Sequence, residues 1–233
     1  MKKTLTIAGS DSCGGAGIQA DIKSMSANGV YAMSVITAIT AQNTMGVVEI
    51  EDVSPSMIKA QIKAIFDDIE VDAIKIGMVS KSGFKLLSDD AKDTLVKELF
   101  PLATLITPNL PEAEEILGIE ITNLEEMKEA AVKLLELGAK AVLVKGGHLE
   151  DDATDLLYDG KKFTFFEQKR INTKHTHGTG CTLSSAIAAN LAKGMDLTEA
   201  VTEGKEYITG AIEHGFELGH GVGPTNHFYK FFK

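Results

Sequence analysis

The chain has 233 residues, of which 44% are hydrophobic and 24% charged, and it carries a formal net charge of −10. This length gives room for one sizeable folded domain or two small ones, and the negative charge argues against nucleic acid or an acidic membrane surface as the main partner. No apolar run reaches the length of a membrane span, and two cysteines without CxxC spacing favour a reducing cytoplasm over a disulfide framework.

The first part of the chain alternates predicted strands and helices. Short apolar and β-branched runs predict strands at residues 4–8, 31–40 and 73–76. A helix is predicted from residue 18 to residue 28, where Gly29 provides a stop. Ser54-Pro55 opens a second helix by a cap-then-proline signature. The apolar residues of this second helix keep helical spacing and predict one buried face: Ile58, Ile62, Ile65, Phe66 and Ile69.

The rest of the chain continues the alternation. Ser88 and Asn123 are helix caps, so helices are expected to about residue 99 and from residue 124 to a stop at Gly138. Strands are predicted at 103–107 and 140–145, and a turn at 108–112 leads into a short helix. Asp159-Gly160, between the apolar runs 156–158 and 163–166, predicts a hairpin. Two long helices follow, one reaching about residue 193 and one spanning about 197–214.

This order of elements indicates a mainly parallel sheet covered by helices on both faces. In such a sheet the loops at the carboxyl ends of the strands form the binding site. Six glycine-dense or polar turns are expected at that edge, namely residues 9–17, 42–44, 77–78, 109–112, 146–148 and 178–181. No linker and no repeat interrupts the chain, so we expect a single domain over residues 1–233.

The most informative stretch is Gly178-Thr179-Gly180-Cys181, which leads into a predicted helix. Its glycines let the backbone approach a ligand closely, and the helix N-terminus is a ready site for an anion such as phosphate. Cys181 falls in the first helical turn, where the dipole favours a thiolate. This combination indicates transfer chemistry on a phosphate-bearing ligand. Taken alone, the stretch fits equally well a turn that caps a helix, with Cys181 as a small core residue.

Five further polar residues have both a functional and a structural interpretation. Asp21 could bind a ligand or serve as an ordinary first-turn acid. Gln42 offers a donor and an acceptor that suit the edge of a planar heterocycle, or it merely ends a strand. Asn109 and Glu112 could hold Mg²⁺-bound water or phosphate, or form a helix cap with glutamate at its third position. Lys145 could meet a phosphate or be a solvated strand end.

Other motifs carry less weight. Residues 15–20 match the dinucleotide pattern G-x-G-x-x-A, but the first glycine lies too far beyond the strand and no acid follows the second strand. A P-loop pattern is absent from the sequence. His175 and His177 form an isolated His-x-His pair in a turn, where we expect no metal.

Several motifs in order give the chain a wider resemblance, which runs from the first strand to the tail. They are residues 8–11, 14–21, 40–44, 75–78, 107–113, 144–148, 176–185 and 223–227. With them, the chain resembles the hydroxymethylpyrimidine/phosphomethylpyrimidine kinases of thiamine biosynthesis, in the ribokinase superfamily. The resemblance implies a three-layer α/β/α fold with a mainly parallel central sheet. It also implies a cytoplasmic homodimer that acts on small molecules.

The resemblance implies ATP-dependent phosphorylation of 4-amino-5-hydroxymethyl-2-methylpyrimidine on its hydroxyl, and then of the monophosphate to the diphosphate. The residues that would line the pyrimidine pocket are Gly9, Asp21, Gln42 and Met78. Gly178, Thr179 and Gly180 would form the anion hole for the transferring phosphoryl group. Cys181 occupies the position where most of the superfamily has an aspartate base, and we expect it to accept the hydroxyl proton.

Nucleotide and metal binding are also implied by the resemblance. The residues that would serve Mg²⁺-ATP are Asn109, Glu112, Lys145 and Thr176, with Glu112 as the candidate metal ligand. A pyridoxal kinase is the close alternative, because it shares motifs of the 178–181 type. The run Ala41-Gln42-Asn43-Thr44 favours the aminopyrimidine, since an amide can pair with a ring nitrogen and its exocyclic amine together.

The chain departs from the family pattern at one place. In relatives the Lys-Ile-Gly-Met strand is followed by a helix and a further strand, ending in Asp-x-Val-Met, before a Ser-Gly turn. Here Ser80 meets Lys81 directly, so roughly 30 residues, one helix–strand unit, are absent. Loss of a central strand would leave a void that packed interiors do not tolerate, so we expect the molecule to contain a segment that this sequence omits. A genuine deletion would instead suggest a non-catalytic pyrimidine-binding protein.

Overall fold

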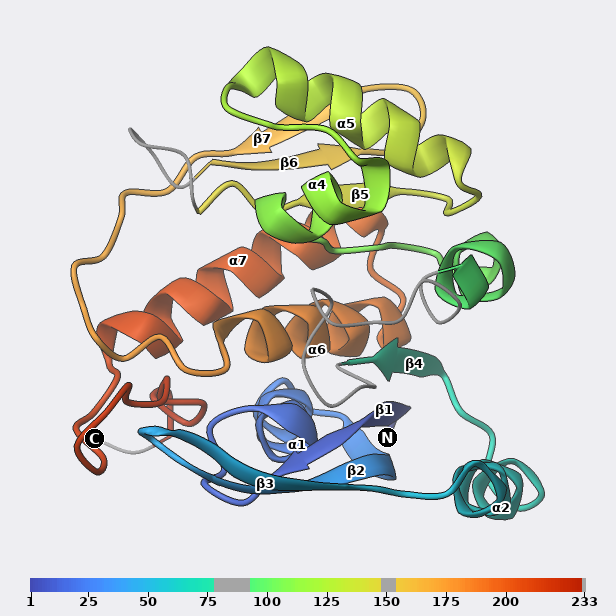
Figure 1. Cartoon of the computed structure of the whole chain (residues 1–233), viewed down its shortest axis with the longest axis vertical. Helices are drawn as coiled ribbons and strands as arrows, with labels where there is room; N and C mark the ends of the chain where they lie inside the picture. The colour runs from blue at the N-terminus through green and yellow to red at the C-terminus, as the bar shows by residue number, and fades with distance from the viewer. Residues whose placement is uncertain (78–92, 148–153, 232–233) are drawn as a thin grey trace. The chain divides into compact units, whose positions relative to one another are not determined.

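The computed structural model describes residues 1–77, 93–147 and 154–231. These residues form two compact units, one from Met1–Gly83 with Ile171–Lys233 and the other from Phe84–Arg170. Figure 1 labels the elements of both. Four predicted features lie outside the described residues: Met78, the junction of Ser80 and Lys81, the Ser88 cap and His148.

The first unit is built on a four-stranded sheet. Its strands are β1 (Lys3–Asp11), β2 (Tyr31–Asn43), β3 (Gly46–Asp52) and β4 (Ala73–Ile76), in the order β3-β2-β1-β4. β1 runs parallel to β2 and β4, whereas β3 returns antiparallel to β2. The mainly parallel sheet of the α/β class is therefore confirmed. β3 was not predicted, because its side chains are almost all exposed and show no buried face to mark a strand.

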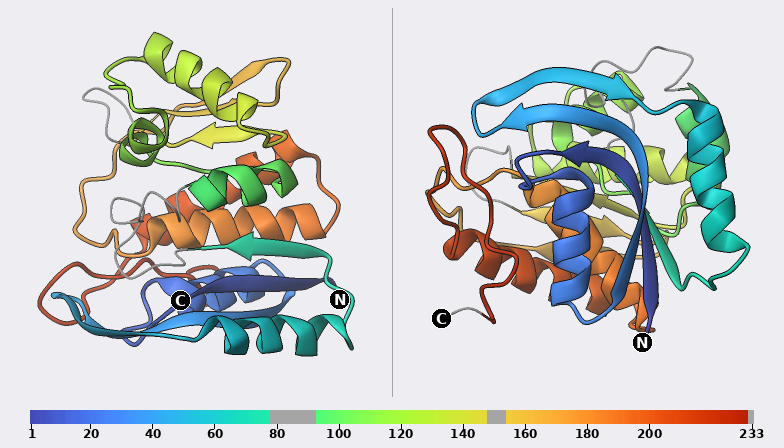
Figure 2. Two further views of the ribbon diagram at one scale, coloured as in Figure 1. Left: turned by 45° about the vertical axis from the view of Figure 1, so that its right-hand side comes forward. Right: turned by 90° about the horizontal axis from the view of Figure 1, so that it is seen from below.

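Helices α1 (Gly17–Ala27) and α6 (Thr179–Ala192) pack against each other and against β1, as Figure 2 shows. Helix α7 (Leu197–Glu213) packs on α6. Most side chains of α6 are buried, and its small residues allow this close packing. Met25 and Val30 meet Ala188 and Ala189 in an apolar cluster between the N-terminal elements and α6. This packing holds the start of α6 beside the glycine-rich loop that follows β1.

Helix α2 (Pro55–Phe66) confirms one prediction and contradicts another. Ser54 caps it by accepting a hydrogen bond from the Met57 N–H, and Pro55 occupies the first turn. The predicted buried face was wrong, because no residue of α2 is fully buried and Phe66 is 48% exposed. The helix packs chiefly on β2, so its apolar stripe is only partly covered.

The second unit combines helices with a small antiparallel sheet. Its helices are α4 (Leu110–Leu117) and α5 (Leu124–Glu136), preceded by the short turns Leu95–Leu99 and Phe100–Leu102. Its strands β5 (Val142–Val144), β6 (Asp155–Tyr158) and β7 (Phe163–Phe166) follow in that order. The predicted hairpin connects β6 to β7. Met127 and Leu134 of α5 pack onto Val142, Val144 and Leu156.

The strand predicted at 103–107 is not formed as a ladder. Ile106 and Asn109 make only isolated parallel bridges, to Val142 and Lys145. The segment runs beside β5 and shares single hydrogen bonds with it, but Pro108 lacks an N–H and helix α4 begins immediately after Asn109. The bridges still align the carboxyl end of this segment with that of β5.

A buried ion pair connects four elements of the first unit. Asp21 of α1 has no exposed surface, and its carboxylate oxygens accept hydrogen bonds of 2.7 and 2.8 Å from Lys75 Nζ of β4. Thr6 and Ser185 also donate to this carboxylate, at 2.6 and 2.7 Å. Asp21 therefore has no free surface for a ligand in this structure. Its observed contacts join β1, β4, α1 and α6.

We expect Lys75→Met to lower the free energy of unfolding by about 3–5 kcal/mol, because it leaves the buried Asp21 charge without its partner. Urea unfolding followed by circular dichroism measures the change. The matched control is Lys63→Met, which breaks an exposed pair with Asp67 on α2 and should have no measurable effect. Equal effects of the two substitutions would contradict the role of the buried pair.

Candidate active site

The loop after β1 closes tightly on the end of that strand. Gly9 lies at an irregularity in the pairing of β1 with β2, and Ser10 bridges to Gly17 at the start of α1. Gly17 has a φ of +56°, and a Cβ there would lie 2.3 Å from the Gly9 carbonyl oxygen. Only glycine fits at this position. The sequence therefore folds residues 12–16 into a compact loop over the end of the sheet.

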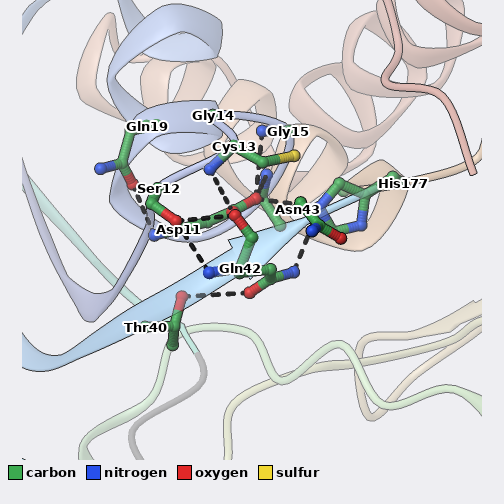
Figure 3. A network of polar contacts seen from close by, with 12 residues as sticks. Asp11, Ser12, Cys13, Gly14, Gly15, Gln19, Thr40, Gln42, Asn43 and His177 are labelled. Atoms are coloured by element: carbon green, nitrogen blue, oxygen red, sulfur yellow. Dashed lines mark hydrogen bonds and ion pairs between the residues drawn. The ribbon is translucent and has the colours of Figure 1, made fainter. Parts of the chain in front are cut away.

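Asp11 organises this loop from the end of β1 (Figure 3). Its Oδ1 accepts the Cys13 N–H at 2.9 Å, and its Oδ2 accepts those of Gly15 and Ala16 at 3.1 and 2.8 Å. The same Oδ2 lies 2.9 Å from His177 Nε2. Burial alone raises the pKa of Asp11, but the hydrogen bonds from His177, Ala16 and Cys13 outweigh it and lower the pKa to about 2. Asp11 is therefore a carboxylate at any physiological pH.

The predicted anion turn forms the start of α6. Gly178 is the N-cap residue with a φ of +81°, and a Cβ on it would lie 1.8 Å from the Gly15 carbonyl oxygen. The turn and the loop after β1 are thus in direct backbone contact. Gly178 has no side chain to cap the helix, and within the described part of the chain the N–H groups of Gly180 and Cys181 have no acceptor. These groups are available to an anion.

Gln42 lies at the same edge of the sheet. Its backbone N–H and C=O both pair with the Ser12 hydroxyl, at 2.8 and 2.7 Å, which ties the end of β2 to the loop after β1. Its side-chain amide lies 3.4 Å from His177 Nε2 and 3.2 Å from the Thr40 hydroxyl. The structure therefore gathers Gly9, Gln42 and the start of α6 around one loop.

A buried polar cluster supports the anion turn from behind. The Thr182 hydroxyl donates to the Gly178 carbonyl at 2.9 Å, so it accepts from His227 Nε2, which lies 3.0 Å away. The Tyr207 hydroxyl donates to the His227 carbonyl at 2.8 Å. Burial, helped by the nearby charge of Lys23, lowers the pKa of His227 to about 4. His227 is therefore neutral at physiological pH.

The depressed pKa of His227 predicts a pH dependence of stability. Above pH 6.5 the histidine is neutral in both folded and unfolded chains, so it contributes no difference. Between pH 6.5 and 4 only the unfolded chain binds the proton, so stability falls by up to about 3 kcal/mol as the pH drops through this window. Urea unfolding at several pH values should show this loss in the natural chain. His227→Gln should flatten the curve over the same window, and a slope unchanged by the substitution would contradict the assignment.

Three of the residues predicted to bind nucleotide lie together in the second unit. Asn109 and Glu112 form a capping box at the start of α4, with Asn109 Oδ1 accepting the Glu112 N–H and Glu112 Oε2 accepting the Asn109 N–H, both at 2.8 Å. Lys145 follows β5 and bridges to Asn109. The structural interpretation of Asn109 and Glu112 is thus confirmed, and the second carboxylate oxygen of Glu112 accepts no hydrogen bond from the residues that the structure describes. The fourth predicted residue, Thr176, is exposed in the first unit.

One group of metal-type ligands occurs among the described residues, formed by Asp11, Cys13 and His177. Asp11 Oδ2 already accepts three hydrogen bonds, and burial together with the Asp11 charge raises the pKa of Cys13, which disfavours its thiolate. The observed geometry is a hydrogen-bonded cluster.

No helix in the described ranges is long and apolar enough to cross a membrane.

Asp11, His177 and His227 were the residues that sequence reasoning did not assign to the site. Asp11 precedes the glycine-rich loop, and an aspartate directly after a strand is a known organiser of turns. His177 adjoins Gly178 and was treated only as half of a His-x-His pair. Their pairing joins positions far apart in sequence, so no local pattern could reveal it.

Comparison with known proteins agrees with this architecture. The model of the phosphomethylpyrimidine kinase family matches residues 11–83 and 78–226. A hydroxymethylpyrimidine/phosphomethylpyrimidine kinase of Rhizobium meliloti is 49% identical over 260 residues, which cover 98% of each chain.

Two solved structures are also similar. A phosphomethylpyrimidine kinase of Clostridium difficile has a TM-score of 0.80 and 49% identity, over 91% of this chain and 100% of the other. A Bacillus subtilis pyridoxal kinase in an ADP complex has a TM-score of 0.90 and 41% identity, over 97% of each chain. The expected α/β fold class of the ribokinase-like kinases is therefore confirmed. The chain is an enzyme of the phosphomethylpyrimidine kinase family.

Proposed function

We propose that this chain is an ATP-dependent kinase that phosphorylates 4-amino-5-hydroxymethyl-2-methylpyrimidine and then converts the monophosphate to the diphosphate. The observation that carries the proposal is that the loop after β1 contacts both partners of the site. Its Gly15 touches Gly178 at the start of α6, and its Ser12 is hydrogen-bonded to Gln42 at the end of β2. This contact brings an anion-binding helix start next to an amide able to read a heterocycle edge. The Rhizobium meliloti relative is named for this activity, and the alignment covers 98% of each chain.

The reaction follows from the residues at the start of α6. The substrate hydroxyl attacks the terminal phosphoryl group of ATP, whose bond to the leaving ADP breaks. The N–H groups of Gly180 and Cys181 would stabilise the charge on the transferring group, as preorganised donors do in phosphoryl transfer. The Cys181 sulfur would accept the hydroxyl proton late in the transfer. Thr179 was also predicted to bind the anion, but its N–H donates to the Thr176 carbonyl at 3.3 Å, so Gly178 and Thr179 would shape the turn.

Asn109, Glu112, Lys145 and Thr176 are proposed to bind the nucleotide. When bound, Mg²⁺ neutralises phosphate charge, and it needs few protein ligands because it keeps several waters. Glu112 fits this role, since one of its oxygens is held by the Asn109 N–H, which orients the other. Lys145 would supply a positive charge to phosphate oxygens.

The proposal is tested by ATP consumption with hydroxymethylpyrimidine as the acceptor, in parallel with pyridoxal. We expect the pyrimidine to give the higher kcat/KM, and mass spectrometry to identify its mono- and diphosphate. A preference for pyridoxal would favour the alternative that the solved pyridoxal kinase supports. Binding of the pyrimidine without ATP consumption would favour a non-catalytic binding protein.

We also propose that the complete molecule contains a further helix–strand unit after β4. The family model matches in two segments that meet at residues 78–83, and the Rhizobium alignment of 260 residues is longer than this chain. In the described part of the chain β4 pairs only with β1, and its Ile74 and Ile76 are 48% and 39% exposed. A further strand would cover this edge.

The test of this unit is to insert the corresponding Rhizobium segment between Ser80 and Lys81. We expect the insertion to raise the unfolding temperature and the rate of ATP consumption. A 233-residue chain that is as stable and as active as the longer one would contradict the proposal.

A cytoplasmic homodimer completes the proposal. Exposed apolar side chains on β2, β3 and α2 support a second copy as partner. Val48 is 80% exposed, Met45 is 71% exposed and Met57 is 55% exposed. Light scattering after size-exclusion chromatography measures the mass, and a monomer would contradict this part.

A further inference from the structure

The orientation of the Gln42 side-chain amide is decided by a chain of hydrogen bonds that begins at Asp11 (Figure 3). Asp11 is 3% exposed and ionised, so its Oδ2 only accepts hydrogen bonds. His177 Nε2, 2.9 Å away, must therefore carry a proton and donate it to Asp11. The Asp11 carboxylate thus determines which ring nitrogen of His177 is protonated.

The tautomer of His177 with its proton on Nε2 in turn constrains Gln42. The structure has Gln42 Nε2 3.4 Å from His177 Nε2, but a ring nitrogen that bears its own proton has no lone pair to accept a hydrogen bond from that amide nitrogen. The amide oxygen, not the amide nitrogen, is the favourable neighbour of His177. The oxygen and nitrogen of an amide have the same shape, so their placement follows from the hydrogen bonds around them.

The other side of the amide gives the same answer independently. The Thr40 hydroxyl has one proton and lies 2.9 Å from the Ser10 carbonyl, which can only accept it. Thr40 then has no proton left for Gln42 Oε1, which lies 3.2 Å away, whereas exchange of the amide oxygen and nitrogen lets Thr40 accept a hydrogen bond from the nitrogen. Both neighbours require the amide nitrogen toward Thr40 and the amide oxygen toward His177. One N–H and one oxygen lone pair of Gln42 then remain for a ligand.

We infer that Asp11 is a positioning residue for substrate recognition, which acts through His177 to set which end of the Gln42 amide donates and which accepts. The inference rests on the proposed function, in which Gln42 contacts the substrate ring. The amide then matches a ring nitrogen next to an exocyclic amine. The reversed pattern, a ring N–H next to a carbonyl, places donor against donor and acceptor against acceptor.

The test compares two nearly isosteric acceptors with opposite patterns. These are 4-amino-5-hydroxymethyl-2-methylpyrimidine and its 4-oxo analogue, in which the amine is replaced by a carbonyl and the adjacent ring nitrogen carries a proton. We measure the ratio of their kcat/KM values in each variant. Both compounds meet the same folded fraction of each variant, so a loss of stability alone leaves the ratio unchanged.

His177→Met and His177→Gln form the matched pair of variants. Glutamine keeps an N–H that can donate to Asp11 and to Gln42, whereas methionine has similar length and no donor. We expect His177→Met to lower the amino-to-oxo ratio about tenfold or more, mainly through the KM for the pyrimidine, and His177→Gln to restore most of it. The KM for ATP should change little in both.

Asp11→Ala removes the acceptor of the His177 Nε2 proton and with it the origin of the relay. The histidine is then free to present a lone pair at Nε2, and the ratio should again fall toward one. If this variant does not fold, the His177 pair decides. Equal ratios for the methionine and glutamine variants would overturn the inference. Failure of the natural chain to phosphorylate the amino compound would instead overturn the proposed function.

Discussion

Replacement of Cys181 by alanine should lower kcat for the first phosphorylation by about 10²–10⁴-fold, the usual contribution of a general base. Cys181 lies in the first turn of α6 as a half-buried free thiol, next to N–H groups that have no acceptor among the described residues. Loss of the thiol removes the proton acceptor but leaves these N–H groups in place. Rapid-quench assays measure kcat, and titration with a fluorescent ATP analogue should give an unchanged dissociation constant.

The second phosphorylation provides an internal control for this prediction. Its acceptor is a phosphate whose second pKa is about 6, so at pH 8 the attacking oxygen has already lost its proton. A base is then not needed, and Cys181→Ala should slow the second step much less than the first. Equal losses in both steps would show that Cys181 has another role, and an unchanged kcat for the alcohol would contradict the assignment of the base.

Replacement of Gly178 by alanine should strongly damage the site. The new Cβ would lie 1.8 Å from the Gly15 carbonyl oxygen, in a backbone conformation with a φ of +81° that alanine rarely adopts. The loop and the start of α6 must separate, which displaces the anion-binding N–H groups. We expect kcat/KM to fall about 100-fold, as for loss of an oxyanion donor, and the free energy of unfolding to fall by about 3–4 kcal/mol.

Gly194→Ala is the matched control for this substitution. Gly194 follows α6 with a φ of +92°, but a Cβ there meets no atom within 4 Å. Alanine at residue 194 should therefore cost only about 1 kcal/mol of backbone strain and leave kcat/KM unchanged. If the two variants lost the same stability and activity, the contact between Gly178 and Gly15 would have no special role.

The fold could be predicted where local chemistry decides it. Ser54 and Asn109 cap helices as expected, and the Asp159-Gly160 turn forms its hairpin. The predictions failed where the structure of a segment depends on the elements that pack against it. The 103–107 segment has strand composition but pairs with β5 only at single bridges, and α2 has a helical apolar stripe that its neighbours only partly cover.

The site shows the same division. The positions of Gly178 at a helix start and Gln42 at a strand end were predicted from residue type, and their roles in binding stay predictions. Asp21 was expected in the pocket, but it is buried in an ion pair with Lys75. The two residues are 54 positions apart in sequence, so only the fold reveals the pair. The pairing of Asp11 with His177 spans 166 residues and could not be predicted either.

The most direct test of the proposed function is the number of ADP molecules released per acceptor molecule. A limiting amount of 4-amino-5-hydroxymethyl-2-methylpyrimidine is incubated with excess Mg²⁺-ATP until the reaction stops. We expect two ADP for each pyrimidine, because the hydroxyl and then the new phosphate are both phosphorylated, and one ADP for each pyridoxal that reacts. One ADP per pyrimidine, or none, would contradict a kinase that makes the diphosphate.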